Sequence, residues 1–226
     1  MNARTALVTG ANRGLGLAVS RHLLAAGHTV VTAARSRAAA EETARLLGPG
    51  ARPAVLDVTD EDSVRAARRH IGPVGILVNN AGVLLDDGTP PDRVAVDRVA
   101  DTLAVNTLGA LRVSQAFLPA MLERGWGRVV MLSSGTGAFS HGLNAATPAY
   151  SVSKAALNAV TVLLATATRD RGVLVNAVNP GRVRTRMMPG ATTTPDEAAA
   201  DVAWAATLPD SGPTGAFLRA RRPVDW

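Results

Sequence analysis

The chain has 226 residues, a formal charge of +6, 47% hydrophobic residues and no cysteine. This length fits one domain with a sizeable core, which must consist mainly of Ala, Val and Leu because only 3% of the residues are aromatic. The composition excludes disulfides, thiol nucleophiles and thiolate metal sites, and no run of about 20 apolar residues could span a membrane.

The positive charge is spread over most of the chain. Arginine supplies 23 of the 24 positively charged side chains, with the densest groups at residues 65–69, 182–186 and 219–222. The first group repeats at helical spacing, which is typical of a solvated helix face. Although phosphate attracts arginine, this distribution argues against a nucleic-acid partner and fits a small polyphosphate ligand better. Residues 1–4 lead straight into a predicted strand and leave no room for a signal peptide, so we expect a cytoplasmic protein without a membrane segment or a metal.

The first predicted strand, residues 5–9, ends in a glycine-rich turn. Its glycines are Gly10, Gly14 and Gly16, and residues 17–26 are predicted to be helical. A strand, a glycine turn and a helix together bind a pyrophosphate, because the turn lets the backbone approach the ligand and the helix dipole points at its charge. The spacing differs from G-x-G-x-x-G, so the turn by itself does not identify a dinucleotide site.

The next two predicted strands suggest which dinucleotide binds. Arg35 follows the strand at residues 29–34, about 20 residues beyond the glycines, where an acidic residue would hold a ribose 2′-hydroxyl and an arginine receives a 2′-phosphate. This predicts NADP(H), with Arg13 in reach of the same phosphate; the alternative is a solvent-exposed arginine. Asp57 ends a strand at residues 53–57 and is placed either to accept a hydrogen bond from the adenine amino group or to serve the turn.

The order of these elements predicts the fold class. Residues 59–62 cap a helix, residues 75–79 form a fourth strand, and the small residues that follow, 80–82, let the backbone pass close to a cofactor. Three strand–helix units followed by another strand imply right-handed crossovers and a parallel sheet. We therefore predict a doubly wound α/β fold of the Rossmann type, with about seven strands, helices on both faces and a single domain over residues 1–226.

Two polar sites lie in the middle of the chain. Residues 92–123 are predicted to form mostly one long helix, and Asn106 is a polar amide in its apolar part, which must be satisfied either by nearby backbone or by a functional contact. The fifth predicted strand, residues 127–132, ends at Ser133 and Ser134. Side chains at the carboxyl end of a parallel strand lie in the crevice where such sheets bind ligands.

The helix predicted over residues 149–169 carries the only tyrosine of the chain, Tyr150, and its only lysine, Lys154. Positions i and i+4 share a helix face with Cβ atoms roughly 5 to 6 Å apart, so the phenol and the ammonium can act on one ligand. A free phenol has a pKa of about 10, and a cation about 5 Å away, at an effective dielectric of about 20, would lower that pKa to between about 7 and 8. We therefore expect a general acid-base pair. The alternative is an ordinary surface pair.

The last third of the chain completes the sheet. Residues 173–178 are the sixth predicted strand and lead into residues 179–185. Thr194 and Pro195 then start a helix that extends to about residue 207, with threonine as N-cap and proline as the first helical residue. Residues 215–219 are predicted as a last edge strand.

In this order and spacing, the motifs resemble those of the short-chain dehydrogenase/reductase family across essentially the whole chain. The matching motifs are the glycine turn after Thr9, residues 79–82, Asn106, Ser133-Ser134, Tyr150 with Lys154, and residues 179–181. The closing segments, residues 212–217 and 223–226, resemble the carbonyl-reductase branch. The resemblance implies an NADPH-dependent enzyme that reduces a small ketone or aldehyde to an alcohol, or catalyses the reverse oxidation, as a homodimer or homotetramer.

The resemblance also implies a role for each site residue. Tyr150 would be the general acid, and Lys154 would lower its pKa and hold the nicotinamide ribose. Ser134 would hydrogen-bond the substrate oxygen, and Asn106 would maintain a water for proton relay. Val183 and Thr185 would contact the nicotinamide carboxamide. The implied cofactor-binding residues are Gly10, Asn12, Arg13, Gly14, Leu15, Gly16, Arg35, Asp57, Val58, Asn80, Ala81, Gly82, Tyr150, Lys154, Pro180, Gly181, Val183 and Thr185.

The chain departs from the family pattern in two loops. Ser134 lies 16 residues before Tyr150, a longer spacing than the family often shows, so Ser133 remains an alternative catalytic hydroxyl. The loop after Thr185 is short and predicts only a small lid. Four apolar side chains would then either line an open substrate pocket or pack in the core: Phe139, Leu143, Met187 and Met188. A function of a different class also stays open, namely a non-catalytic NADP(H)-binding regulatory protein.

Overall fold

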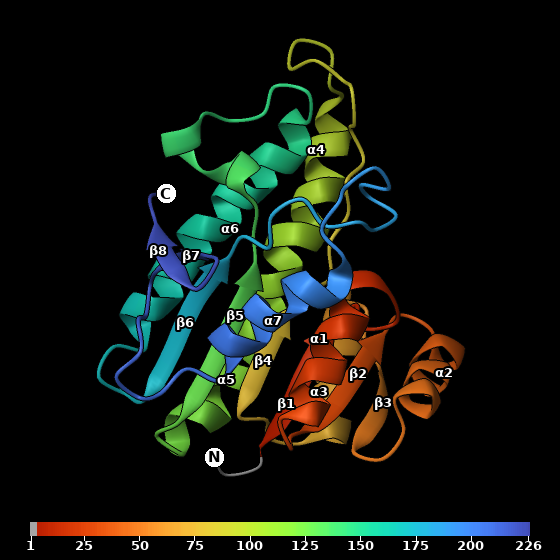
Figure 1. The fold of residues 1–226 in the computed structure, drawn as a ribbon, viewed down its shortest axis with the longest axis vertical. Helices are drawn as coiled ribbons and strands as arrows, with labels where there is room; N and C mark the ends of the chain where they lie inside the picture. The colour runs from red at the N-terminus through yellow and green to blue at the C-terminus, as the bar shows by residue number, and fades with distance from the viewer. Residues whose placement is uncertain (1–3) are drawn as a thin grey trace.

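The computed structural model describes residues 4–226; the expectation about a signal peptide rests partly on residues 1–3, which lie outside this range. Eight strands form one sheet in the order β3-β2-β1-β4-β5-β6-β7-β8 (Figure 1). Neighbouring strands are parallel except for β7 and β8. The strands are β1 Thr5–Thr9, β2 Thr29–Ala34, β3 Ala51–Val55, β4 Ile76–Asn79, β5 Gly127–Leu132, β6 Val173–Val178, β7 Phe217–Arg219 and β8 Arg222–Val224. The predicted α/β fold is confirmed, with one strand more than expected.

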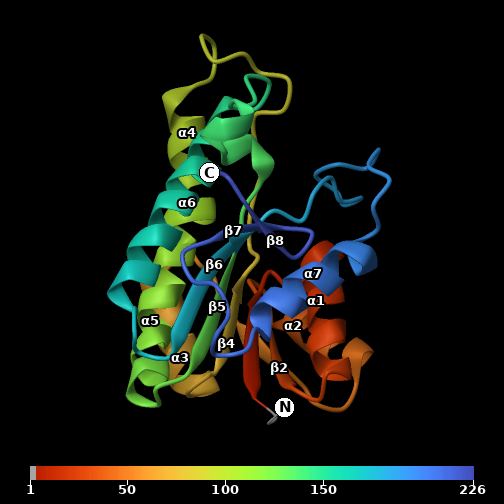
Figure 2. The ribbon, with the colours of Figure 1, turned by 60° about the vertical axis from the view of Figure 1, so that its left-hand side comes forward.

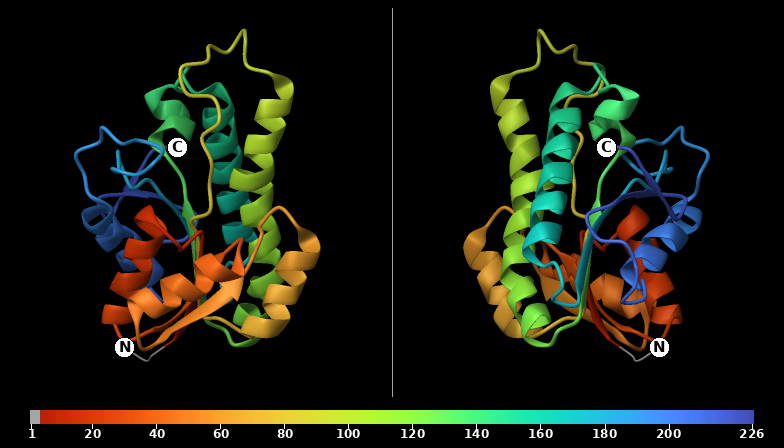
Figure 3. Two further views of the ribbon diagram at one scale, coloured as in Figure 1. Left: turned by 90° about the vertical axis from the view of Figure 1, so that its right-hand side faces the viewer. Right: turned by 90° about the vertical axis from the view of Figure 1, so that its left-hand side faces the viewer.

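Helices cover both faces of this sheet (Figures 2 and 3). They are α1 Gly14–Ala25, α2 Arg37–Leu47, α3 Glu61–Ile71, α4 Val96–Leu103, α5 Ala110–Glu123, α6 Pro148–Ala167 and α7 Pro195–Ala206. On one face, Leu23 of α1 and Val202 of α7 join an apolar core with strand residues. On the other face, Phe117 of α5 and Leu157 of α6 do the same. No helix within residues 4–226 is long and apolar enough to cross a membrane.

The strand order reverses between β1 and β4, which places a ligand-binding crevice at the carboxyl ends of these strands. The loops that follow β1, β4, β5 and β6 all leave from this edge of the sheet, which is uppermost in Figure 1. Strands β5 and β6 are buried at every residue, and their bounds agree with those predicted from the sequence, because each is a mainly apolar run, interrupted only by Arg128 or Asn176, that ends in polar residues.

The helix predicted over residues 92–123 is divided in the structure. It begins only at Val96, and Ala104–Gly109 form a π-helical segment, η1, between α4 and α5. Asn106 lies in this segment and is buried. Wider turns of this kind are frequent at functional sites. Gly109 is needed here, because a Cβ on this residue would lie 2.7 Å from the Val58 side chain.

The unexpected eighth strand forms a hairpin with β7. The turn residues Ala220 and Arg221 have φ angles of 47° and 62°. Asn and Gly are the usual residues in such turns, so the pattern of the sequence does not reveal the hairpin. Pro223 is compatible with β8 because this strand lies at the edge of the sheet.

A buried arginine holds the opposite end of β5. Arg128 is 1% exposed. Its guanidinium donates to the carbonyl oxygens of Leu208 and Gly172 at 2.7 and 3.2 Å and forms an ion pair with Asp210 at 2.5 Å. It also lies 4.4 Å from the ring centre of Trp126. One side chain therefore links β5 to the segments that follow α6 and α7.

Replacing Arg128 by Ala should destabilise the fold strongly. The substitution removes the donor to the Leu208 carbonyl oxygen and opens a cavity, so we expect the free energy of unfolding to fall by about 2 to 4 kcal/mol. Urea denaturation measures this change. Arg171→Ala is the matched control, since Arg171 is exposed. Equal losses in the two variants would contradict the assigned role of Arg128.

Candidate active site

The glycine turn after β1 is held against the end of β4 by Asn80. The Asn80 side-chain amide donates to the carbonyl oxygens of Thr9 and Gly10 at 2.8 and 3.1 Å. In return, Thr9 Oγ1 accepts from the backbone N–H groups of Asn80 and Ala81, both at 3.0 Å. A Cβ on Gly16 would collide with the Asn80 amide and lie 2.5 Å from the Gly10 oxygen, so only glycine fits. Two motifs far apart in the sequence therefore form one unit at the strand-order reversal.

The first turn of α1 offers free N–H groups at this place. Arg13 precedes the helix, no side chain caps its start, and its first turn contains no acidic residue. Asn12 and Arg13 are exposed and Leu15 is half-buried. Gly14 has a φ of 52°, and a Cβ there would lie 3.5 Å from the Thr185 methyl group. An uncapped helix start of this kind fits a phosphate group.

The short loop predicted after Thr185 is present and folds on itself. Bridges join Val183 to Thr193 and Thr185 to Met188. Met187 is 42% exposed and Met188 is half-buried. On the opposite loop, the other two predicted apolar lining residues are also exposed, Phe139 by 72% and Leu143 by 40%. Apart from the half-buried Met188, these side chains are not packed in the core.

Asn179 connects this region to the loop after β5. Its Oδ1 accepts from the Gly181 N–H at 3.0 Å, and a Cβ on Gly135 would lie 3.0 Å from its Nδ2. Pro180 and Gly181, two of the predicted cofactor-binding residues, therefore come directly after a residue that packs against the loop after β5.

Arg35 and Asp57 lie at the same edge of the sheet, because β2 and β3 pair with Ala34 opposite Val55. Thr59 donates side-chain and backbone hydrogen bonds to the Asp57 carboxylate at 2.7 and 2.9 Å, and these bonds are the main reason why the pKa of Asp57 is lowered. The charge of Arg35 lowers this pKa further. Asp57 therefore serves the turn, as the alternative interpretation proposed. Its contact with adenine stays a prediction, as does that of Val58, whose side chain is buried against η1.

Tyr150 and Lys154 lie together at the start of α6. Lys154 Nζ is 5.4 Å from the ring centre of Tyr150 and donates to the Leu132 carbonyl oxygen at 2.7 Å. A Cβ on Gly82 would lie 3.9 Å from the same nitrogen, so the ammonium also borders the loop after β4. Lys154 is 5% exposed and is therefore a buried cation, not a member of a surface pair.

The expected lowering of the Tyr150 pKa is wrong for the protein on its own. Burial raises this pKa to about 12, and a hydrogen bond with Ser134 offsets only part of the effect. Burial also lowers the pKa of Lys154 to about 8. Removal from water disfavours the charged form of each group, which raises the pKa of the phenol and lowers that of the ammonium. At neutral pH the site therefore holds a neutral phenol beside an ammonium, which is a proton-donating state.

The two adjacent serines at the end of β5 have different partners. Ser133 is buried and donates to Asn158 Oδ1 at 2.5 Å. Ser134 is half-buried, bonds with Tyr150, and accepts from the Thr136 N–H at 3.3 Å. Only Ser134 therefore contacts the predicted acid, and this geometry favours it over Ser133 as the catalytic hydroxyl.

Asn106 fixes the loop after β4. Its Oδ1 accepts from the Val83 N–H at 2.8 Å, and its Nδ2 donates to the Val83 oxygen at 2.9 Å and to Ser153 Oγ at 3.0 Å. The side chain is thus satisfied mainly by backbone, although this backbone is 23 residues away. The predicted role of Asn106 in holding a water is not tested by these contacts.

Two further residues hold this site in place and were not predicted from the sequence. Asn158 carries a signal that could have been found, because it lies four positions beyond Lys154 on the same helix face. Asp86 carries none. It is buried, and its carboxylate accepts from the backbone of α6 although it lies in the loop after β4.

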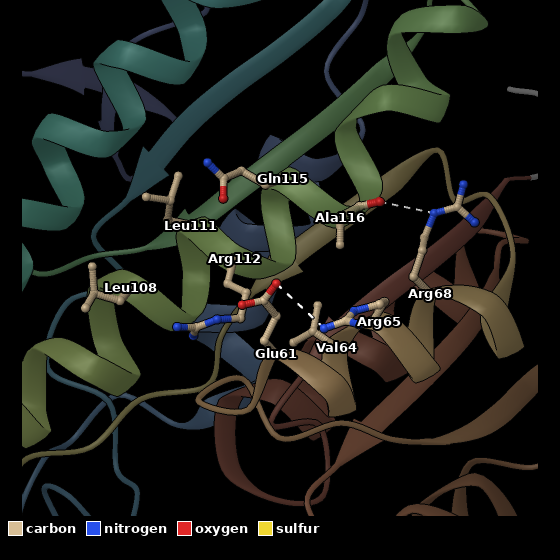
Figure 4. Close-up of a pocket in the computed structure, with 9 residues that line it drawn as sticks. All are labelled: Glu61, Val64, Arg65, Arg68, Leu108, Leu111, Arg112, Gln115 and Ala116. Atoms are coloured by element: carbon tan, nitrogen blue, oxygen red, sulfur yellow. Dashed lines mark hydrogen bonds and ion pairs between the residues drawn. The ribbon is translucent and has the colours of Figure 1, made fainter.

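A groove of about 530 Å³ between α3 and α5 lies apart from this site (Figure 4). It is lined by Glu61, Val64, Arg65, Arg68, Leu108, Leu111, Arg112, Gln115 and Ala116, none of them a predicted site residue. Two of its arginines bond to neighbouring elements: Arg68 donates to the Ala116 oxygen at 3.1 Å and Arg112 to the Val58 oxygen at 2.7 Å. Among the side chains that the structure describes, no three His, Asp or Glu residues meet to hold a metal.

Comparison with known proteins decides the family. The profile described as short chain dehydrogenase matches residues 4–196. The chain belongs to the short-chain dehydrogenase family. It is therefore an oxidoreductase that acts on C=O or CH–OH groups with a nicotinamide cofactor.

Sequence relatives of this short-chain dehydrogenase include bacterial 3-oxoacyl-(acyl-carrier-protein) reductases. It is 35% identical over 188 residues to FabG of Salmonella typhimurium, which covers 81% of this chain and 75% of that protein. It is 36% identical over 194 residues to FabG of Pseudomonas aeruginosa, which covers 83% and 76%.

Solved structures extend the likeness to the whole chain. The NADPH-bound carbonyl reductase from chicken fatty liver is similar with a TM-score of 0.88, at 29% identity and over 100% of both chains. A 3-ketoacyl-(acyl-carrier-protein) reductase from Brucella melitensis complexed with NADH has a TM-score of 0.86, at 26% identity and over 96% of both chains. The expected likeness to carbonyl reductase therefore appears among the structures, whereas the sequence relatives named above are ketoacyl reductases.

The single lysine of this short-chain dehydrogenase allows its pKa to be measured directly. In protein labelled with ¹³C,¹⁵N-lysine, only Lys154 contributes side-chain NMR signals. Because burial lowers its pKa, we expect these signals to titrate near pH 8 and not at the ordinary 10.5. The unfolded chain then binds more protons between these values, so Lys154 makes stability rise with pH from about 8 to about 10.5. The urea-unfolded protein is the control, and a native titration at the same pH as the unfolded one would contradict the prediction.

Proposed function

We propose that the protein is an NADPH-dependent reductase that converts a ketone or aldehyde to an alcohol, with Tyr150 as the general acid. The observation that carries the proposal is the meeting of Tyr150, Lys154 and Ser134 at the sheet edge that also bears the glycine turn. Hydrogen bonds link Lys154 to the end of β5, and Asn80 links the glycine turn to the end of β4, the neighbouring strand.

Tyr150 suits the reductive direction. When bound, NADPH supplies a hydride to the carbonyl carbon. The carbonyl oxygen then carries negative charge and needs a proton, and the Tyr150 hydroxyl donates it while Ser134 donates a hydrogen bond to the same oxygen. With a pKa raised to about 12, Tyr150 is fully protonated at neutral pH before each turnover. The oxidative direction would need the phenolate and is therefore favoured only at high pH.

Lys154 supports both the acid and the cofactor. An ammonium has three donors, and only one of them is used by the Leu132 carbonyl oxygen at 2.7 Å. The other donors are available for the ribose hydroxyls of the nicotinamide half. The positive charge also stabilises the phenolate that remains after the proton has been transferred.

The cofactor residues fit NADPH better than NADH. Arg35 is exposed at the end of β2, where the adenosine ribose would lie, and Arg13 is exposed in the glycine turn. Two exposed guanidinium groups complement a 2′-phosphate. Gly16 lets the turn pack closely against Asn80, because a Cβ there would collide with the Asn80 amide and the Gly10 oxygen, and the glycine turn is the part that would approach the pyrophosphate.

The substrate class is best tested first with 3-oxoacyl thioesters, since these fit the names of the bacterial relatives. The exposed side chains of Phe139, Leu143 and Met187 offer apolar contact area on two loops of the catalytic edge. Such an open surface fits an acyl chain that enters from solvent.

Self-association is proposed through the helices on the α5–α6 face. Leu108 of η1 and Leu163 of α6 are 50% and 68% exposed, and Val152 of α6 is 44% exposed. Apolar side chains exposed along two neighbouring elements are typical of an interface between subunits. A dimer or tetramer would cover them.

Replacing Tyr150 by Phe tests the assigned acid. Loss of the hydroxyl removes the proton donor, so we expect NADPH oxidation with an active carbonyl substrate to fall by about 10² to 10⁴-fold. NADPH binding, followed by fluorescence titration, should remain within about twofold because the ring is retained. Undiminished turnover would exclude Tyr150 as the acid. Tight NADPH binding by the unaltered protein without turnover of any carbonyl would instead favour the non-catalytic regulatory alternative.

Replacing Arg35 by Ala tests the cofactor preference. If its guanidinium binds the 2′-phosphate, the dissociation constant for NADPH should rise by about 10- to 100-fold while that for NADH stays nearly constant. Arg37→Ala is the matched control, since Arg37 is an exposed arginine two residues further on. Equal losses for NADPH and NADH would contradict the contact.

A further inference from the structure

The start of α6 lacks a cap from its own sequence. Thr147 is the N-cap residue and is of a type that often caps, but its side chain makes no capping bond. Pro148 has no N–H group, and the Ser151 N–H already bonds to the Thr147 carbonyl oxygen at 2.8 Å. Only two N–H groups of the first turn therefore need an acceptor, those of Ala149 and Tyr150.

Both N–H groups point to one carboxylate oxygen from a distant loop. Asp86 Oδ2 accepts from Ala149 at 2.5 Å and from Tyr150 at 3.4 Å, across sequence separations of 63 and 64 residues. Helices α2, α3 and α7 differ, because each is capped by its own N-cap side chain: Ser36, Asp60 and Thr194.

Asp86 is far more enclosed than an ordinary cap. It is 2% exposed, and its Oδ1 is buried with no hydrogen-bond partner among the residues that the structure describes. Burying a carboxylate in this way costs free energy that a cap on a solvated helix would not incur. Thr147, the residue that could have capped α6 locally, also has a buried hydroxyl for which the described part of the chain offers no partner. Stability alone would be served better by a local threonine cap.

The loop that carries Asp86 is itself fixed at both ends. Before Asp86, the Asn106 side chain holds both backbone polar groups of Val83. After it, the Gly88 N–H donates to the Ala146 carbonyl oxygen at 3.0 Å, directly before α6. The position of the carboxylate is thus defined relative to both Asn106 and the start of the helix.

We propose that Asp86 is a positioning residue for catalysis, which holds the backbone of Tyr150 so that its hydroxyl meets the substrate oxygen. The proposal rests on the proposed function, in which Tyr150 is the general acid. Tyr150 is the third residue of α6, so a shift of the first turn moves its ring directly, whereas Lys154 is held one turn later by its own bond to Leu132.

Three substitutions of Asp86 and one control test this role. Asp86→Ala should lower kcat by about 10- to 100-fold, because a displacement of about 1 Å can have that effect, while the dissociation constant of NADPH and KM change little. Asp86→Asn keeps an acceptor oxygen and should recover most of kcat. Asp86→Glu keeps charge and acceptor but displaces them, and should be impaired even though it folds. Asp87→Ala, at the exposed neighbour, should behave like the unaltered protein.

A spectroscopic measurement separates positioning from activity. Tyr150 is the only tyrosine, so ¹³C-tyrosine labelling gives the NMR signals of this ring alone. We expect these signals to shift in Asp86→Ala and Asp86→Glu but not in Asp86→Asn or Asp87→Ala. In a Tyr150→Phe background, Asp86→Ala should cause no further loss of the residual rate, because Asp86 acts only through the missing hydroxyl.

The outcomes distinguish a failure of the proposed function from a failure of the positioning role of Asp86. If Tyr150→Phe retains full turnover, the proposed function fails and the positioning role fails with it. If Tyr150→Phe is inactive but Asp86→Ala and Asp86→Glu keep the unaltered kcat and ring signals, only the positioning role is overturned. An Asp86→Asn variant as impaired as Asp86→Ala would also overturn it. Should Asp86→Ala fail to fold, as shown by its thermal unfolding, Asp86→Glu decides.

Discussion

The burial of one ammonium group is the constraint on which this site depends. Lys154 is 5% exposed and forms no ion pair with any side chain that the structure describes; it donates to the Leu132 carbonyl oxygen at 2.7 Å. A buried cation that is only partly satisfied is unfavourable, and its pKa falls to about 8 for this reason. A ligand that offers further acceptor oxygens therefore gains affinity from the same burial that destabilises the free protein. The free energy that Lys154 loses through burial is thus partly recovered when a ligand binds.

The end of β5 and one face of α6 match residue by residue. Leu132 accepts from Lys154, Ser133 donates to Asn158, and Ser134 bonds with Tyr150. The three helix residues are spaced by four, so they lie on a single face, while their partners are the last residue of β5 and the two residues that follow it. The helix is thereby fixed along more than two turns against the end of β5 and the serines that follow it. This is how a parallel sheet can hold a phenol, a hydroxyl and an ammonium in constant relative positions.

The sequence predicts those features that arise from local patterns. Strands β5 and β6 are apolar runs with clear ends, and the capping residues Thr194 and Pro195 start α7 as expected. The pairing of Tyr150 with Lys154 also follows from spacing on a helix. Features that depend on tertiary burial could not be predicted. The pKa of Tyr150 rises because the fold removes it from water, and spacing contains no information about that. The π-helical segment around Asn106 and the cap by Asp86 arise from contacts with residues far away in the sequence.

The distant cap on α6 has a consequence for local unfolding. A helix with a cap from its own sequence can keep its first turn when a neighbouring loop opens, but α6 cannot, because its acceptor leaves with the loop after β4. The same loop forms part of the glycine-turn unit through Asn80. Opening of the loop after β4 would therefore loosen the glycine turn and the first turn of α6, which carries Tyr150, in one step.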